Sequence, residues 1–211
     1  LILVGSVFNT ICQGAEMEHL LRRMPVVLAN GTLALPDAYS VMVDDCRGVE
    51  MAVEHLVKTG RRDLYYIKDK STDSAAAKAK GFLSGMAGAG LDAEGHILET
   101  GETLEDGIRA VQQLLADGIH PDGILCGEDL TAAGVLKALL RAGVRVPEET
   151  AVVGYDNSTY ARLCEPELTS VDNKPEQVAL LCVQLLQSRI EHGEDYSSVT
   201  LQPELVQRQS S

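Results

Sequence analysis

An acid that follows an apolar run in the last third of the chain could bind a ligand. Val152 to Tyr155 are typical of a buried strand, and Asp156 and Asn157 follow directly. A carboxylate in this place can accept hydrogen bonds from two hydroxyl or amine groups of a ligand. Asp156 could instead cap the turn that comes next, as aspartate often does. The residue types alone leave both interpretations open.

A hydroxyl and an ammonium group lie one turn apart near the start of a predicted helix over 74–89. Ser74 and Lys78 are separated by four residues, so they share a helix face. The N-terminus of a helix offers free N–H groups and a positive dipole, to which Lys78 adds a cation. This pair would suit a polar or anionic part of a ligand. The alternative is a capping serine with a solvated lysine.

Two acids open another predicted helix. Gly127, Glu128 and Asp129 follow a predicted strand over 123–126. One interpretation makes Glu128 a hydrogen-bonding acid that faces a ligand. The other makes both acids ordinary capping residues, whose carboxylates satisfy free N–H groups of the helix.

Patterns for catalysis or metal binding are missing from the sequence. It has no G-x-S-x-G, no Walker loop and no G-x-G-x-x-G. The five histidines are not spaced with another His or Cys as metal ligands would be. The five cysteines are scattered without a C-x-x-C, which favours free thiols in a reducing cytoplasm. We therefore expect no catalytic residue, no metal and no cofactor.

Strand and helix patterns alternate along the chain. Strands are predicted at 1–5, 25–29, 40–43, 63–67, 96–99, 123–126, 151–154, 168–171 and 199–201. Helices are predicted at 13–24, 45–59, 74–89, 104–116, 130–142 and 174–190. Such alternation predicts an α/β fold with parallel sheets that helices cover on both faces. Ligands of these sheets bind beyond the carboxyl ends of the strands, where Asp156 and Glu128 are expected.

Composition and charge limit the possible partners. Hydrophobic residues make up 45% and charged residues 23%, as in an ordinary globular protein. The net charge of −13 would repel phosphates, so these residues are not expected to bind nucleic acid themselves. No segment approaches the ~18 apolar residues of a membrane span, so no membrane partner is expected. The apolar start at Leu1 suggests that an N-terminal portion is absent.

Several motifs, in order and spacing, resemble the lactose-repressor/galactose-repressor (LacI/GalR) family. They are Pro25–Leu28, Val43–Asp45, Lys78–Phe82, Cys126–Gly134, Gly143–Pro147, Val152–Asn157, Pro166–Val171 and the ending Pro203–Ser211. Each motif is weak alone, but together they cover essentially the whole chain. The resemblance implies two Rossmann-like lobes of the periplasmic-binding-protein type. Residues 1–44 and 174–202 would form part of the N-terminal lobe, and 45–173 and 203–211 the C-terminal lobe.

The resemblance also assigns roles to individual residues. Asp156 matches the ligand-binding acid of the family, and Ser74 matches a frequent hydroxyl contact. Ser6 and Phe8 match cleft positions that follow a strand of the N-terminal lobe. Lys78 stands where the family usually has an arginine, and lysine lacks the planar bidentate fork of that residue.

Two further departures concern the ligand. Glu128 stands where sugar-binding members often have asparagine. Near Thr103, where purine-binding members place a stacking aromatic residue, the sequence has none. These departures argue against a purine and favour a sugar or another polar metabolite.

The resemblance implies a cytoplasmic, non-enzymatic repressor core that binds a small-molecule effector and forms a homodimer. It would contact operator DNA through a helix-turn-helix that precedes Leu1. Effector binding would shift the population of two conformations. A secreted solute-binding protein of a transporter shares this fold and is the main alternative. A small α/β enzyme is the other, although it would need a catalytic set that the sequence does not show.

Overall fold

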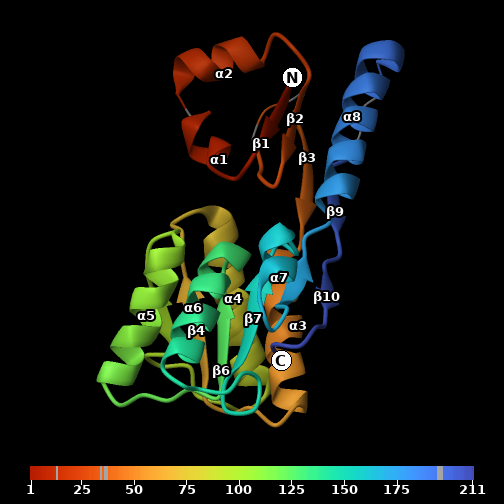
Figure 1. Cartoon of the computed structure of the whole chain (residues 1–211). Helices are drawn as coiled ribbons and strands as arrows, with labels where there is room; N and C mark the ends of the chain where they lie inside the picture. The colour runs from red at the N-terminus through yellow and green to blue at the C-terminus, as the bar shows by residue number, and fades with distance from the viewer. Residues whose placement is uncertain (13, 34, 36–37, 194–196) are drawn as a thin grey trace. The chain divides into compact units, whose positions relative to one another are not determined.

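The computed structural model describes residues 1–12, 14–33, 35, 38–193 and 197–211 (Figure 1). The chain forms two compact units. Unit 1 comprises Leu1–Asp44, Thr72–Ser74 and Lys174–Gln202, and unit 2 comprises Asp45–Ser71, Ala75–Asn173 and Pro203–Ser211. The chain therefore passes between the units more than once, and each unit is built from separate stretches of sequence.

Unit 1 is a parallel sheet with few helices. Its strands are β1 (Ile2–Val4), β2 (Val26–Ala29), β3 (Ala38–Val43) and β9 (Val199–Leu201), in the order β1-β2-β3-β9. Its helices are α1 (Phe8–Ile11), α2 (Ala15–Leu21) and α8 (Pro175–His192). Helix α8 packs Val178 and Cys182 against Val27 and Val41 of the sheet, as its apolar periodicity predicts.

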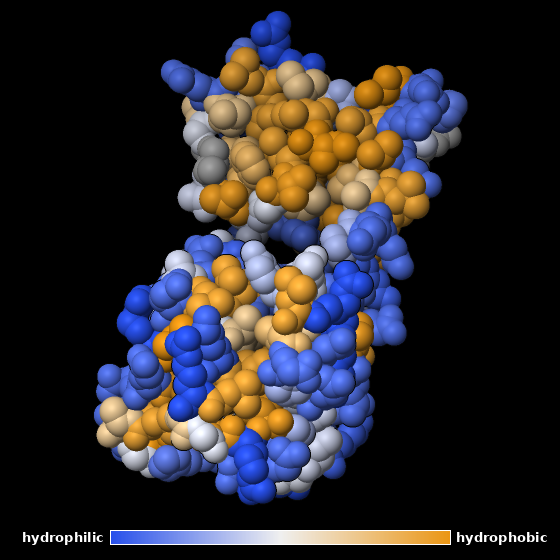
Figure 2. All heavy atoms as spheres, in the orientation of Figure 1, coloured by the Kyte–Doolittle hydropathy of each residue, from blue (hydrophilic) through white to orange (hydrophobic). Residues whose placement is uncertain are grey.

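Apolar side chains remain exposed on unit 1. Most of the exposed large apolar residues belong to this unit, although unit 2 is larger; they are Leu1, Val4, Val7, Met17, Leu20, Met24, Leu180, Val183 and Ile190. Figure 2 shows apolar atoms gathered on the face of this unit that the view presents. The core of unit 1 is thus covered less completely than that of unit 2.

Unit 2 is a six-stranded sheet with helices on both faces. Its strands are β4 (Leu64–Lys68), β5 (Ile97–Glu99), β6 (Gly123–Cys126), β7 (Ala151–Tyr155), β8 (Thr169–Asp172) and β10 (Glu204–Val206). Its helices are α3 (Asp45–Lys58), α4 (Asp73–Gly88, whose first two residues belong to unit 1), α5 (Leu104–Ala116), α6 (Asp129–Arg141) and α7 (Thr159–Leu163). The strand order is β10-β8-β7-β6-β4-β5, and only the β10–β8 pair is antiparallel among these described strands.

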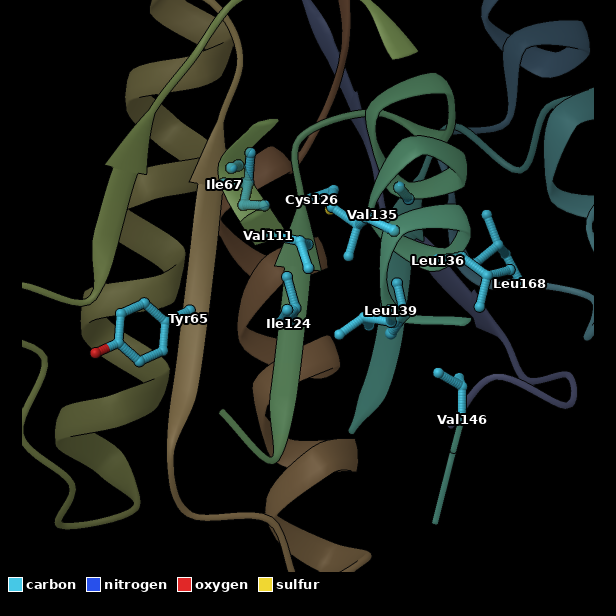
Figure 3. Packing of buried hydrophobic residues seen from close by; sticks show 14 of the residues in the cluster. Tyr65, Ile67, Val111, Ile124, Cys126, Val135, Leu136, Leu139, Val146 and Leu168 are labelled. Carbon is cyan, nitrogen blue, oxygen red and sulfur yellow. The ribbon is translucent and has the colours of Figure 1, made fainter. Parts of the chain in front are cut away.

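The core of unit 2 lies on both faces of this sheet. Because side chains alternate along a strand, Tyr65 and Ile67 face one side of the sheet and Leu64 and Tyr66 the other. The first cluster joins strands β4 and β6 to α5 and α6, with Ile124 at its centre (Figure 3). Burial on both faces explains why the strands are nearly continuous apolar runs.

Helices α5 and α6 approach closely because glycines face each other at their contact. A Cβ atom on Gly134 would lie 2.1 Å from the carbonyl oxygen of Leu104, and one on Gly107 would lie 2.3 Å from that of Thr131. Glycine is therefore required on both sides of this contact.

Helix α5 begins with a capping box, in which Thr103 and Asp106 satisfy each other's backbone N–H groups.

The predicted α/β fold with mainly parallel sheets is confirmed, and most predicted elements lie within a few residues of the observed ones. The helix predicted over 13–24 is present but shorter: α2 begins after Gly14, whose backbone is extended, and ends at Leu21. Residue 13 lies outside the described residues. The prediction missed α1, α7 and β10. None of the described helices has the length and apolar character to cross a membrane.

Candidate functional site

Polar side chains gather where the parallel strands of unit 2 end. Asp69 follows β4, Glu128 follows β6, and Asp156 follows Tyr155 at the end of β7. With Lys78 of α4 these residues form the carboxyl-edge cluster, which comprises Asp69, Lys78, Glu128, Tyr155 and Asp156. Parallel strands bring their carboxyl ends to one edge of a sheet, and this is where ligands of open α/β sheets bind.

Lys78 is a buried cation at the centre of the cluster. Its side chain is 8% exposed. Its Nζ donates a hydrogen bond to the carbonyl oxygen of Gly127 at 2.8 Å and lies 3.7 Å from the centroid of the Tyr155 ring. A cation over the face of an aromatic ring is attracted by the quadrupole of the ring. The interpretation of Lys78 as a solvated surface residue is therefore wrong.

Tyr155 links Lys78 to the start of helix α3. The hydroxyl of Tyr155 donates a hydrogen bond of 2.7 Å to Oδ1 of Asp45. Burial, followed by the negative charge of Asp45, raises the pKa of Tyr155, so the phenol stays protonated and keeps donating. A Cβ atom on Gly48 would lie 2.8 Å from that hydroxyl, so α3 can approach the ring only with glycine at this position. Strand β7, which carries the ring, and helix α3, which contacts it, thus hold the ring beneath the ammonium group of Lys78 on α4.

Asp156 presents a carboxylate whose surroundings disfavour its charged form. Its Oδ1 accepts a hydrogen bond from Nδ2 of Asn173 at 2.8 Å. Burial raises the pKa of Asp156 from its ordinary 3.8 to about 6. Lys78 opposes this rise, while the charges of Glu128 and Asp129 add to it. A carboxylate that is held out of water near other acids gains most when a ligand brings hydrogen-bond donors to it.

The other acids of the cluster also have partners. Oδ2 of Asp69 accepts a hydrogen bond from Thr131 at 3.2 Å, and burial, then the charge of Glu128, raises the pKa of Asp69. Glu128 accepts a hydrogen bond from Lys70, and it makes no side-chain capping bond to α6. Burial lowers the pKa of Lys70, but its bond and ion pair with Glu128 outweigh that effect and raise it overall. The capping interpretation of Glu128 is therefore not supported.

The predicted site residues divide between the two units. Lys78, Glu128 and Asp156 meet at the carboxyl edge of unit 2. Ser6, which lies in the turn before α1, and Phe8 both belong to unit 1, where Phe8 packs against the small core around Cys12 and Val26. Ser74 is the second residue of α4 and belongs to unit 1 by its contacts. The sequence thus identifies three residues that lie together and three that lie in the other unit.

Sequence reasoning missed Tyr155, Asn173 and Asp69 as members of the site. The sequence places Tyr155 in a buried strand, and Asn173 directly follows β8 without any further signal. A signal was available for Asp69, since it directly follows a buried strand. Among the described residues, no group of three or more His, Cys, Asp or Glu is placed to hold a metal ion.

Comparison with known proteins agrees with this architecture. The family described as periplasmic binding protein-like domain matches residues 53–211. The chain is 31% identical over 193 residues to the HTH-type transcriptional repressor PurR of Escherichia fergusonii. This match covers 90% of this chain and 57% of that protein. The chain therefore spans little more than half the length of this curated relative.

Solved structures of regulators are also similar. A LacI transcriptional regulator from a Rhodococcus species is 30% identical with a TM-score of 0.88, and the match covers 100% of this chain and 76% of that one. The transcriptional regulator CelR in complex with cellobiose is 26% identical with a TM-score of 0.84, over 100% of this chain and 65% of that one. The chain therefore belongs to the periplasmic binding protein-like domain family, and within it to the core domains of LacI/GalR-type transcriptional regulators.

Proposed function

We propose that the chain is the effector-binding and dimerisation core of a DNA-binding transcriptional repressor, and that its effector is a small polar metabolite such as a sugar. The observation that carries this proposal is the half-buried Asp156 carboxylate beside the buried Lys78 and Tyr155 at the carboxyl edge of a parallel sheet. Such an edge is where open α/β sheets bind ligands. Sensing rather than catalysis is proposed, since the relatives are regulators.

The charges of the cluster support a polyhydroxylated ligand. Asp69, Glu128 and Asp156 supply three carboxylates, whereas the ammonium of Lys78 already bonds a carbonyl oxygen and Lys70 is paired with Glu128. Carboxylates accept hydrogen bonds from hydroxyl groups and repel anions. The similar regulator CelR forms a complex with cellobiose, which also supports a sugar as the ligand.

Regulation would follow from unequal binding to two conformations. A ligand shifts an equilibrium only by the difference between its affinities for the two states. Ser6, Phe8 and Ser74 stay proposed ligand contacts on the strength of the family resemblance. Replacing each by alanine and measuring the affinity for the effector tests them one by one.

Operator DNA and a second copy of the chain are the proposed partners. The charge of −13 disfavours DNA binding by these residues, so a helix-turn-helix outside the 211 residues would make that contact. Helix α7 supports dimerisation, because Leu163 is 75% and Tyr160 48% exposed there. Sedimentation at micromolar concentration should show a dimer. Leu163→Glu should shift it towards the monomer if α7 lies in the interface.

The similarity to transcriptional regulators favours a cytoplasmic regulator over a secreted solute-binding protein of a transporter. The test of the ligand proposal is mass spectrometry of the small molecules that co-purify with the protein from its native host. We expect a polyhydroxylated compound to be released by denaturing the wild-type protein and to be missing from Asp156→Ala purified in parallel. An equal amount in both preparations would refute the role of Asp156.

A further inference from the structure

The turn that carries Asp156 has a backbone conformation that is rare for its residues. Asp156 has φ of 100° and Asn157 has φ of 49°, so two successive non-glycine residues lie at positive φ. Residues of this kind cost conformational free energy and persist only where the surrounding structure holds them. The question is which contacts hold this turn.

The carboxylate of Asp129 binds Ser158, the last residue of the turn 156–158. Asp129 is 1% exposed. Its Oδ2 accepts hydrogen bonds from the backbone N–H of Ser158 at 2.7 Å and from the hydroxyl of Ser158 at 2.9 Å. Its Oδ1 accepts a third, of 2.7 Å, from the hydroxyl of Ser170 on β8. One buried carboxylate thus joins the start of α6, the turn and the neighbouring strand.

Asn157 is held by the same network. The hydroxyl oxygen of Ser170 accepts a hydrogen bond from the backbone N–H of Asn157 at 3.0 Å. The side chain of Asn157 donates to Asp172 at 3.2 Å and accepts from Arg208 at 2.5 Å. Ser170 therefore links Asp129 by hydrogen bonds to Asn157, the residue next to Asp156.

Asp129 also lies against the strand that leads into the turn. A Cβ atom on Gly154 would lie only 2.2 Å from Oδ1 of Asp129, so glycine is needed for this approach. Asp129 is the first residue of α6, and an acid there also interacts favourably with the helix dipole. The dipole does not require a buried carboxylate with three donors from outside the helix, so capping alone does not account for the arrangement.

We propose that Asp129 is a positioning residue for the ligand site. Through Ser158 and Ser170 it holds the turn 156–158 at positive φ and so keeps the Asp156 carboxylate half-buried at the carboxyl edge. The proposal rests on the proposed function, in which Asp156 binds the effector. It does not make Asp129 a ligand contact, because the side chain is buried and both of its oxygens already accept hydrogen bonds from Ser158 and Ser170.

The test measures the titration of Asp156. Carbon-13 NMR of labelled aspartate carboxyl groups monitors it, and the Asp156→Asn variant identifies the Asp156 signal. Ser170→Ala breaks the link without changing any charge. Thr150→Ala is the matched control. Thr150 is also buried, at 4% exposure, and its hydroxyl donates a hydrogen bond of 2.7 Å to the carbonyl oxygen of Pro121. It directly precedes β7 and so lies at the opposite end of that strand from Asp156. Both variants should melt at a lower temperature than the wild type.

Only Ser170→Ala should change the titration. The wild-type midpoint should lie near a pKa of about 6, and release of the turn into water should lower it by roughly 1 or more in Ser170→Ala. Equal midpoints in Ser170→Ala, Thr150→Ala and the wild type would overturn the proposal. If Ser170→Ala does not fold, Ser158→Ala removes one hydroxyl bond to the same carboxylate and is judged by the same midpoint.

A failure of the proposed function would look different. In that case Asp156→Ala would retain the co-purifying small molecule, whatever the titration of Asp156 shows in Ser170→Ala. Conversely, an unchanged midpoint would refute the role of Asp129 and leave ligand binding by Asp156 standing. The titration needs no ligand, so the two proposals are tested separately.

Discussion

Replacing Asp156 by asparagine should stabilise the ligand-free protein at neutral pH and have much less effect near pH 4. Asparagine has the same size and can still accept the hydrogen bond from Asn173, but it carries no charge. It also tolerates positive φ better than most residues, so the turn should survive. The substitution therefore isolates the cost of holding a negative charge at this position.

The magnitude follows from the pKa of Asp156. Burial raises that pKa from 3.8 to about 6, so folding favours the protonated acid. The resulting stability is fully present below pH 3.8 and is lost as the pH rises through 6. At about 1.4 kcal/mol for each pH unit between the two pKa values, the charged acid costs at most roughly 3 kcal/mol above pH 7. Solvent reaches part of the carboxylate, so we expect a gain on the order of 1–2 kcal/mol for Asp156→Asn.

Urea unfolding at pH 4.5 and pH 7.5 measures this gain. Glu94→Gln, at an exposed position in a turn, serves as the control, because it removes one negative charge elsewhere on unit 2. Asp156→Asn should raise the free energy of unfolding at pH 7.5 by clearly more than at pH 4.5, whereas the control should change little at either pH. A gain of equal size at both pH values, or a loss at pH 7.5, would refute the explanation.

Four other substitutions probe different parts of unit 2. Lys78→Met keeps the apolar body of the side chain but removes a charge that lowers the pKa of Asp156. The midpoint of the Asp156 titration measured by NMR should therefore rise. Gly81→Ala would place a Cβ atom 2.2 Å from the carbonyl oxygen of Cys46 and should cost about 1–3 kcal/mol in urea unfolding. Gly88→Ala, with no atom within 4 Å of the new Cβ, should be neutral or stabilise by up to about 1 kcal/mol. Thr103→Ala removes the cap of α5 and should lower the free energy of unfolding by about 1 kcal/mol.

Each of these outcomes can fail on its own. An unchanged midpoint in Lys78→Met would show that the ammonium does not act on the acid. Equal unfolding curves for Gly81→Ala and Gly88→Ala would contradict the close approach of α4 to the start of α3. A Thr103→Ala variant as stable as the wild type would mean that the capping box contributes nothing measurable.

The sequence predicted the elements whose signals are local. The apolar face of α3, with Val49, Ala52, Val53, Leu56 and Val57, follows from spacing alone. The first four residues are buried, and Val57 is partly buried against the same core. Asp156 could be singled out because an acid directly after a buried strand stands at the edge where ligands bind. These inferences hold because periodicity and strand polarity do not depend on distant contacts.

The remaining features depend on contacts between distant residues. Helix α7 has five residues, and its N-cap is Ser158, which donates hydrogen bonds to Asp129, 29 residues earlier. Strand β10 has three residues and forms by pairing with β8. The burial of Lys78 requires the Tyr155 ring, which stands 77 residues later in the sequence. Sequence spacing cannot show such meetings, so a solvated lysine remained an open interpretation until the fold was known.

The most direct test of the central claim is a thermal-shift screen of the wild type and Asp156→Ala against neutral sugars, sugar phosphates, sugar acids and nucleobases, with hits measured by calorimetry. We expect at least one neutral sugar to raise the melting temperature of the wild type and to bind Asp156→Ala at least about tenfold more weakly, a loss of roughly 1.4 kcal/mol. If the wild type bound a ligand with the same affinity as Asp156→Ala, or responded to none of these classes, the carboxyl edge of unit 2 would not be the sensing site.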